Sequence, residues 1–242
     1  DMCGMGLASL FPMHELSIVG ITSAITHYLP LKKRLASLVD HIRKTRPRMV
    51  LTIDSKAFSL RLGKELKAVM AKEGWQVPIV HLVAPTVWAW ASWRAKNISK
   101  CVDHLLCLFP FEVGYFTKHN VPTYAVGHPA ADIKFSTRAE ARQALGLHDD
   151  DTVVAVFPGS RRREVMELFP DMCAAIKILQ VENPRLKAIL PAARSVRQTI
   201  DAYLTDDDLI EVVDEAQRYD AMRAADVGLI CSGTLTLETA LA

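Results

Sequence analysis

The stretch from Val153 to Val165, VVAVFPGSRRREV, constrains the fold more than any other part of this sequence. Its first residues are apolar and largely β-branched, which predicts a buried strand. A sharp turn follows at residues 158–160, and a helix is expected to begin near Arg161. A strand, a tight loop and a helix in that order predict one βα unit of a parallel sheet.

This turn is suited to an anion. Its backbone N–H groups and the positive end of the helix dipole point toward one place, where Gly159 and Ser160 are candidate ligand-binding residues. The hydroxyl of Ser160 could cap the helix or contact a ligand. Arg161 begins a run of three arginines and supplies a guanidinium suited to a phosphate or diphosphate. An ordinary turn with solvated arginines fits the same residues equally well.

Composition limits the class of protein. A chain of 242 residues, 50% hydrophobic and 23% charged, is typical of a soluble α/β protein with one large or two modest domains. The net charge of +2 is too small to predict a nucleic-acid partner. Five scattered cysteines and eight histidines without ligand spacing favour reduced thiols in the cytoplasm and no structural metal. No apolar run reaches the roughly 20 residues of a membrane span, and no signal peptide is evident.

The two ends of the chain predict a fragment. The sequence starts at Asp1 without an initiator methionine and stops at Ala242 inside an expected helix. We therefore expect both domains to be truncated, the first at its initial strand and loop and the second at its C-terminal part.

The first half carries a candidate catalytic carboxylate. Apolar residues at helical spacing predict a helix over residues 31–45 whose basic face lies in water or, alternatively, on an anionic membrane. The next predicted strand, residues 48–54, ends at Asp54. Ligands of open α/β sheets bind at the carboxyl ends of the strands, so Asp54 is placed for chemistry. Alternatively Asp54, or Ser55, caps the helix predicted over residues 58–73.

Three tryptophans fall within six residues, directly after a third strand predicted over residues 77–83. Trp88 and Trp90 could line a cleft for a sugar or an acyl chain, or bury their rings between domains. A fourth strand is expected over residues 101–109. His128 follows a short strand and is either a loop residue or a ligand contact.

The composition changes between Asp132 and Asp151, where a short helix and an acidic loop predict a domain boundary. The predicted domains are residues 1–148 and 149–242. Strands and helices alternate on both sides, which predicts two parallel-sheet domains.

The second domain contains two strand–turn–helix junctions of similar chemistry. One is PGSR at residues 158–161. The other is Ser232-Gly233-Thr234, which opens a helix that carries Glu238. Together they could bracket a nucleotide diphosphate. The motifs GxxxxGK[ST] and GxGxxG are absent, so ATP hydrolysis and NAD chemistry lack their usual signatures. A diphosphate in one domain and a carboxylate in the other suggest group transfer from a nucleotide-activated donor.

Seven segments, in this order, resemble the lipid-A-disaccharide synthase family: MHELSIVG, LTIDSKAF, APTVWAW, LFPFE, VGHP, FPGSRRREV and SGTLTLE. The resemblance implies a GT-B glycosyltransferase with two Rossmann-like domains that face each other across a cleft. It implies transfer of 2,3-diacylglucosamine from its UDP-activated form to 2,3-diacylglucosamine 1-phosphate, with inversion and without a metal or other cofactor. It also implies peripheral contact with the cytoplasmic face of the inner membrane, and it allows a homodimer of the full-length form.

The resemblance assigns roles to individual positions. Asp54 matches the family's candidate general base for the attacking 6-hydroxyl, and Arg161 matches an arginine expected to stabilise the departing UDP. Glu238 matches, by a weaker analogy, a glutamate that binds ribose hydroxyls. Where family members often read IDAPDF this chain reads IDSKAF, so a second carboxylate is replaced and Lys56 is added. A UDP-sugar 2-epimerase and a non-catalytic lipid- or partner-binding relative remain alternatives.

Overall fold

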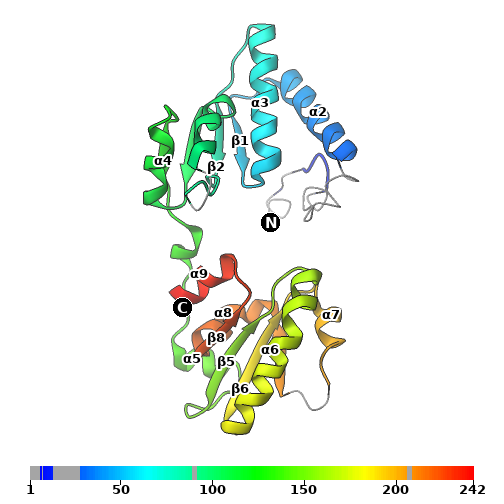
Figure 1. Cartoon of the computed structure of the whole chain (residues 1–242), viewed down its shortest axis with the longest axis vertical. Helices are drawn as coiled ribbons and strands as arrows, with labels where there is room; N and C mark the ends of the chain where they lie inside the picture. The colour runs from blue at the N-terminus through cyan, green and yellow to red at the C-terminus, as the bar shows by residue number, and fades with distance from the viewer. Residues whose placement is uncertain (1–5, 7, 13–27, 89–91, 206–208) are drawn as a thin grey trace. The chain divides into compact units, whose positions relative to one another are not determined.

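A computed structural model describes residues 6, 8–12, 28–88, 92–205 and 209–242. The chain divides into two compact units, unit 1 (Asp1–His128) and unit 2 (Pro129–Ala242), and both are drawn in Figure 1. The described residues of each unit form one four-stranded sheet in which every neighbouring pair is parallel. The prediction of two parallel α/β sheets is confirmed.

Unit 1 has the strand order β1-β2-β3-β4. Its described elements are α2 (Tyr28–Thr45), β1 (Val50–Ile53), α3 (Lys56–Glu73), β2 (Ile79–Leu82), a 3₁₀ helix (Ser92–Lys100), β3 (His104–Cys107), a 3₁₀ turn (Pro110–Glu112), α4 (Val113–Thr117) and β4 (Thr123–Ala125). Helix α3 buries Leu62, Leu66 and Met70, four residues apart, in the same core as Leu35 and Ile42 of α2. The apolar stripe predicted for α2 therefore packs inward, because residues at this spacing share one helix face.

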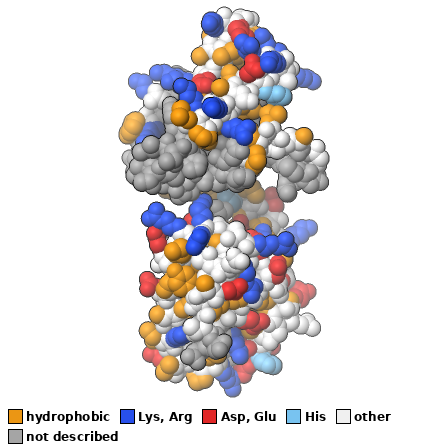
Figure 2. All heavy atoms as spheres, turned by 90° about the vertical axis from the view of Figure 1, so that its right-hand side faces the viewer, with side chains coloured by type: hydrophobic (Ala, Val, Ile, Leu, Met, Phe, Trp, Pro, Cys, Tyr) orange, Lys and Arg blue, Asp and Glu red, His pale blue; other side chains and the backbone are white. Residues whose placement is uncertain are grey.

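The basic face of α2 is exposed and partly paired. Lys44 and Arg43 form ion pairs with Asp40, and Arg43 also contacts Glu73 of α3. Lys and Arg side chains lie among Asp and Glu side chains on both units in the view of Figure 2. Within the described ranges, no helix combines the length and apolar character needed to cross a membrane.

Unit 2 has the strand order β7-β6-β5-β8. Its elements are a 3₁₀ turn (Pro129–Asp132), α5 (Arg138–Ala144), β5 (Thr152–Phe157), α6 (Arg162–Glu182), β6 (Leu186–Ala192), α7 (Arg197–Asp201), β7 (Ile210–Asp214), a 3₁₀ turn (Glu215–Gln217), α8 (Arg218–Ala224), β8 (Val227–Ile230) and α9 (Thr234–Leu241). Strand β5 is buried on both faces. Val154 and Val156 pack with α6, whereas Ala155 and Phe157 pack with α5 and α8. This two-sided burial explains the continuous apolar run, since side chains alternate between the faces of a strand.

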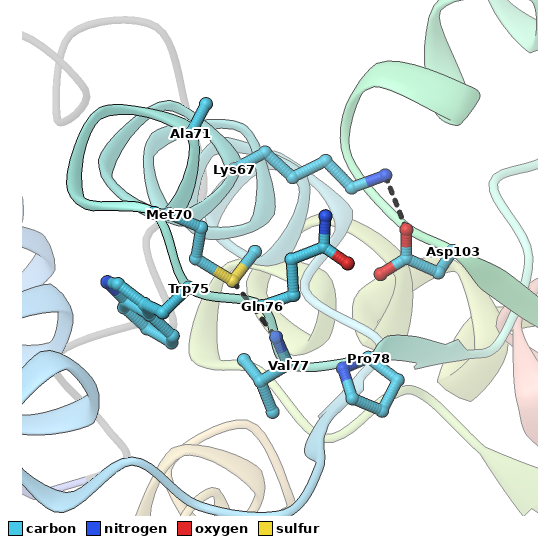
Figure 3. A pocket seen from close by; sticks show the side chains of 9 residues that line it. Lys67, Met70, Ala71, Trp75, Gln76, Val77, Pro78 and Asp103 are labelled. Carbon is cyan, nitrogen blue, oxygen red and sulfur yellow. Dashed lines mark hydrogen bonds and ion pairs between the residues drawn. The ribbon is translucent and has the colours of Figure 1, made fainter.

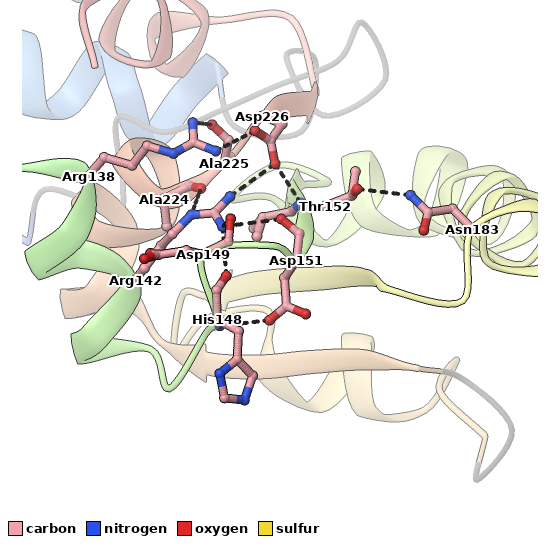
Figure 4. Close-up of polar contacts among 11 residues, drawn as sticks. Arg138, Arg142, His148, Asp149, Asp151, Thr152, Asn183, Ala224, Ala225 and Asp226 are labelled. Atoms are coloured by element: carbon pink, nitrogen blue, oxygen red, sulfur yellow. Dashed lines mark hydrogen bonds and ion pairs between the residues drawn. The ribbon is translucent and has the colours of Figure 1, made fainter.

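The boundary between the units falls at residue 128, not at residue 148 as the composition had indicated. The reason is the buried Arg142 of α5, which ties this segment to unit 2 (Figure 4). Its guanidinium donates to the carbonyl oxygens of Ala224 and His148 and pairs with Asp226 at 3.1 Å. The short helix and the acidic loop are therefore part of unit 2, and Ala141 and Leu145 belong to its core.

Gly63 provides a test of packing in unit 1. A Cβ at this position would lie 2.1 Å from the carbonyl oxygen of Cys101, whereas one at Gly114 would meet nothing within 4 Å. Gly63→Ala should lower the free energy of unfolding by about 1–3 kcal/mol through overpacking. Gly114→Ala, in α4, should raise it by about 0.5–1 kcal/mol.

All four tryptophans lie in unit 1, so urea unfolding followed by tryptophan fluorescence reports this unit alone. Equal effects of the two alanine substitutions would contradict the close approach of α3 to Cys101, which directly follows the 3₁₀ helix.

Arg142 provides the corresponding test in unit 2. Arg142→Met should destabilise unit 2 by about 2–4 kcal/mol, because it leaves carbonyl oxygens and a carboxylate without their buried partner. The matched control is Arg185→Met, which removes only an ion pair with Asp150 whose two side chains are each more than 60% exposed. Thermal unfolding by far-UV circular dichroism measures both variants. Equal stability of the two would contradict the assigned role of Arg142.

Candidate functional site

A pocket of 300 Å³ lies at the carboxyl ends of the strands of unit 2. The turn after β5 contributes Gly159 and Ser160, and α9 contributes Glu238. The structure thus brings the adjacent residues Gly159 and Ser160 together with Glu238, which lies about 80 residues further along the chain. Ligands bind at this edge in open α/β sheets, because the turns and helix N-termini converge there.

The two predicted turns are neighbours. Strand β5 pairs with β8 in parallel, and the N–H of Cys231 donates to the carbonyl oxygen of Phe157 at 2.8 Å. Ser232, Gly233 and Thr234 are exposed at the start of α9, next to the pocket rather than in its lining. A ligand in the pocket that extends along this edge would reach both turns.

The turn after β5 is organised by Glu164, which sequence reasoning did not single out. Its carboxylate accepts hydrogen bonds from the N–H groups of Ser160 and Arg161, both at 3.2 Å, and pairs with the Arg161 guanidinium. Glu164, rather than the Ser160 hydroxyl, therefore caps α6. A Glu three residues after the N-cap is a known capping signal, and it could have revealed this role.

Gly159 is required by this arrangement. Its φ of 113° lies in the left-handed region, and a Cβ there would approach the Glu164 carboxylate oxygen to 2.6 Å. Burial raises the pKa of Glu164, but hydrogen bonds from Arg161 and Ser160 and the charge of Arg161 outweigh it. The net pKa lies below the ordinary value, so Glu164 is a carboxylate at neutral pH.

Arg161 and Glu164 also lie close to the second turn. Burial raises the pKa of the Cys231 thiol, the charge of Glu164 raises it further, and that of Arg161 lowers it. Cys231 directly precedes the turn at Ser232. The ion pair is thus near both turns, and the Arg161 side chain is 62% exposed.

Further residues line the pocket but belong to no turn of small residues, so the sequence alone does not predict them. Glu215 and Arg218 follow β7, and Pro191 and Ala193 belong to the end of β6 and the loop after it. They are recognised only from the strand order, which places β6 and β7 beside β5.

In unit 1, Asp54 directly follows β1, at the carboxyl edge of the sheet. The carbonyl oxygen of Ser55, not a side chain, accepts the first N–H groups of α3. The capping interpretations of the Asp54 and Ser55 side chains are therefore wrong. Asp54 is exposed, and within the described ranges its carboxylate accepts no hydrogen bond.

The backbone at this edge is strained. Asp54, Ser55 and Val83 adopt φ values of 48°, 42° and 74°. Left-handed conformations are uncommon in residues other than glycine, and for a β-branched residue such as Val83 they are costly. Strained backbone of this kind concentrates at functional sites, which adds weight to Asp54 as a site residue.

Aromatic side chains gather on the same edge. Trp88 contacts Phe111 edge to face at 5.4 Å, and Phe109 stacks on Phe111 and on His128 at 5.7 Å. Trp88 is 44% exposed, so its ring is available to a ligand. Trp90 lies outside the described residues. The role of the two tryptophans in substrate binding stays a prediction.

His81 of β2 is fully buried beneath this edge. Its Nδ1 lies 2.8 Å from the Thr52 hydroxyl, and its Nε2 has no hydrogen-bond partner in the part of the chain that is described. Burial lowers the pKa of His81 below its ordinary value, although the Asp54 carboxylate opposes this. The imidazole is therefore neutral at neutral pH.

A larger hollow, of 770 Å³, lies at the opposite, amino edge of the unit 1 sheet (Figure 3). Its charged groups already satisfy one another. Lys67 pairs with Asp103 at 2.8 Å, and Asp103 also accepts the N–H of Ile79. It therefore offers no free charge to a ligand. Among the described residues, no group of three His, Cys, Asp or Glu side chains is arranged to hold a metal ion.

A model of the lipid-A-disaccharide synthetase family matches residues 1–242, the whole chain. The chain belongs to this family. A lipid-A-disaccharide synthase from Alcanivorax borkumensis is 41% identical over 98% of the chain and 62% of its own length. One from Rhodospirillum centenum is 37% identical over 100% of the chain and 60% of its own length. The chain thus spans about three fifths of the length of these curated relatives.

Solved structures agree on the fold. UDP-GlcNAc 2-epimerase from Neisseria meningitidis, bound to UDP-GlcNAc, aligns with a TM-score of 0.54 over 89% of the chain and 61% of its own, at 15% identity. The same enzyme from Methanocaldococcus jannaschii, in complex with UDP-GlcNAc and UDP, aligns with a TM-score of 0.51 over 86% of the chain and 61% of its own, at 12% identity. The GT-B type of α/β fold expected for the family is confirmed.

The buried neutral His81 predicts a pH dependence of stability. In the unfolded chain the imidazole takes up a proton as the pH falls through about 6.5, whereas the folded site resists it. The stability of unit 1 should therefore fall between pH 7 and pH 5.5. His81→Asn should make this slope shallower.

Urea unfolding followed by tryptophan fluorescence at several pH values measures the slope. His148→Gln, an exposed histidine in unit 2, is the control and should leave it unchanged. An identical slope for the wild type and His81→Asn would show that His81 is not held neutral.

Proposed function

We propose that this chain binds a UDP-activated diacylglucosamine donor in unit 2 and carries the acceptor-side base in unit 1. The reaction is that of a lipid-A-disaccharide synthase, in which the donor is joined to diacylglucosamine 1-phosphate and UDP is released. The observation that carries this proposal is the pocket at the carboxyl edge of the unit 2 sheet, lined by Gly159, Ser160 and Glu238, in a chain of this family.

Unit 2 has the groups that a nucleoside diphosphate needs. Glu238 lines the pocket at the side of α9, where it can accept hydrogen bonds from ribose hydroxyls. The diphosphate is proposed to lie along the two turns, within reach of Ser232, Gly233 and Thr234 and of the Arg161 guanidinium. Charge on the departing UDP would be stabilised there, which lowers the barrier for cleavage of the anomeric bond.

Asp54 is proposed to accept the proton of the acceptor's 6-hydroxyl. A general base must be ionised and unoccupied, and the exposed carboxylate of Asp54 accepts no hydrogen bond from the described residues. Attack by the deprotonated oxygen on the anomeric carbon displaces UDP and inverts the configuration. The proton on Asp54 then passes to solvent, and no metal or other cofactor takes part.

The acyl chains of the acceptor are proposed to meet the aromatic edge of unit 1. Trp88 presents an exposed ring beside Phe111, and Trp90 lies two residues further along the chain. Aromatic rings of this kind suit acyl chains and the interfacial region of a bilayer. We accordingly propose peripheral contact with the cytoplasmic face of the inner membrane, and a homodimer in the full-length protein.

The alternative of a UDP-sugar 2-epimerase has less support. The epimerases share the fold at 12–15% identity, whereas the synthases are 37–41% identical over nearly the whole chain. A likeness of fold alone carries no activity. An assay with both acylated substrates that yields disaccharide and UDP distinguishes the synthase from the epimerase and from a non-catalytic relative.

Two substitutions in the full-length protein test the two roles separately. Asp54→Asn should lower turnover by about 100-fold or more and leave UDP affinity within about twofold, because the base acts only on the acceptor. Arg161→Ala should lower turnover and also weaken UDP binding by about tenfold. Turnover is measured as disaccharide formed, and UDP affinity by calorimetry.

The controls are Glu65→Gln on the exposed face of α3 and Arg162→Ala, next to Arg161. Both should retain turnover and UDP affinity. Normal turnover in Asp54→Asn would remove the base assignment, and normal UDP affinity in Arg161→Ala would remove that side chain from the diphosphate site.

A further inference from the structure

The groups that face a donor diphosphate are already engaged by a negative side chain of the chain itself. The Glu164 carboxylate accepts the N–H groups of Ser160 and Arg161 at 3.2 Å and pairs with the Arg161 guanidinium. These are two amides of the turn and the only arginine side chain that the PGSR motif supplies. A phosphate uses donors of the same kind, with similar geometry.

The arrangement allows the carboxylate to reach the turn from within the same helix. Glu164 is three residues after Arg161, and Gly159 leaves the space that the carboxylate fills, since a Cβ there would lie 2.6 Å from its oxygen. Its side chain is 27% exposed, so it is neither locked in the core nor fully solvated. It can leave the turn by rotation of its own side chain.

The charge balance opposes donor binding as long as the pair persists. Arg161 and Glu164 together carry no net charge, and the carboxylate would repel an incoming diphosphate. Arg162 and Arg163 follow Arg161, and Arg163 pairs with Glu167. The pocket itself is lined by one further positive charge, Arg218, and by two negative ones, Glu215 and Glu238. A diphosphate that takes over the Arg161 guanidinium and the two N–H groups would satisfy all of them and release Glu164 to water.

We propose that Glu164 is an internal counter-anion of the donor site, which occupies its anion-binding groups in the free protein and is displaced by the diphosphate of the donor. This rests on the proposed function of unit 2. Before the donor binds, Glu164 orders the turn and positions the Arg161 side chain. The diphosphate can bind only by displacing the Glu164 carboxylate from these groups. It thereby also favours release of UDP after transfer, because the carboxylate returns to the same groups.

A purely structural cap would behave differently. Gln at this position of a capping box still accepts backbone N–H groups, so Glu164→Gln keeps the cap and removes the charge. If Glu164 only caps α6, the substitution leaves ligand affinity unchanged or weakens it. If Glu164 competes for Arg161, the substitution strengthens affinity.

The test is calorimetric titration of the full-length protein with UDP and, separately, with inorganic diphosphate. Glu164→Gln should bind both ligands about three- to tenfold more tightly than the wild type, as expected for loss of one partly exposed charge pair. Glu167→Gln is the matched control. It removes the same charge three residues further along α6, away from the turn, and should change affinity by less than about twofold. The gain from Glu164→Gln should be smaller in the Arg161→Ala background than in the wild type, because only the competition for the guanidinium is lost there.

Three results are distinguishable. Tighter binding of both ligands by Glu164→Gln alone supports the competition. Wild-type binding of UDP with equal or weaker binding by Glu164→Gln overturns the inference and leaves the proposed function intact. Failure of both proteins to bind UDP, with α6 intact by circular dichroism, overturns the inference together with the proposed function.

Discussion

The parallel pairing of β5 with β8 is the interaction on which the site of unit 2 depends. It aligns Phe157 with Ile230, so that the turns after the two strands end at the same edge of the sheet. The pairing is secured by burial of β5 on both faces, between α6 on one side and α5 and α8 on the other. Hydrophobic burial of β5 thus determines where the polar groups of the two turns lie, although these groups are outside the core.

Unit 1 also has a parallel sheet, but different chemical groups lie at its carboxyl edge. Its carboxyl edge presents the exposed carboxylate of Asp54 and exposed aromatic rings, whereas that of unit 2 presents N–H groups and a guanidinium. The residues with strained backbone at this edge, Asp54 and Val83, both act on the buried His81, the first through its charge and the second through a backbone hydrogen bond. Within the described ranges one imidazole nitrogen has no hydrogen-bond partner, and such a nitrogen is costly in a core.

Much of the fold follows from the sequence because its signals are local. The apolar run at Val153 and the spacing of Leu35 and Ile42 predict their strand and helix, which the structure confirms. Asp54 and Gly159 were recognised because each follows such a strand. The boundary was misplaced because Arg142 reads as a surface residue in sequence and is buried by partners about 80 residues away.

The residues that sequence reasoning missed share one property. Arg218 and Glu215 enter the pocket only through the strand order, and Glu164 acts through a contact within its own turn that competes with the expected ligand. Neither residue type carries a pattern that separates a ligand contact from a solvated charge. Only the tertiary arrangement makes that distinction, since it alone shows which groups converge.

The central claim is that unit 2 binds a uridine diphosphate at the carboxyl edge of its sheet. The most direct measurement is a two-dimensional amide NMR spectrum recorded during titration with UDP. The account predicts that the signals of Gly159, Ser160, Gly233 and Thr234 shift together and saturate at one ligand concentration, and that those of the amino-edge residues Gln76 and Asp103 do not move. Two results would contradict this account: saturable shifts confined to the amino edge of the unit 1 sheet, or no shifts at the two turns of unit 2.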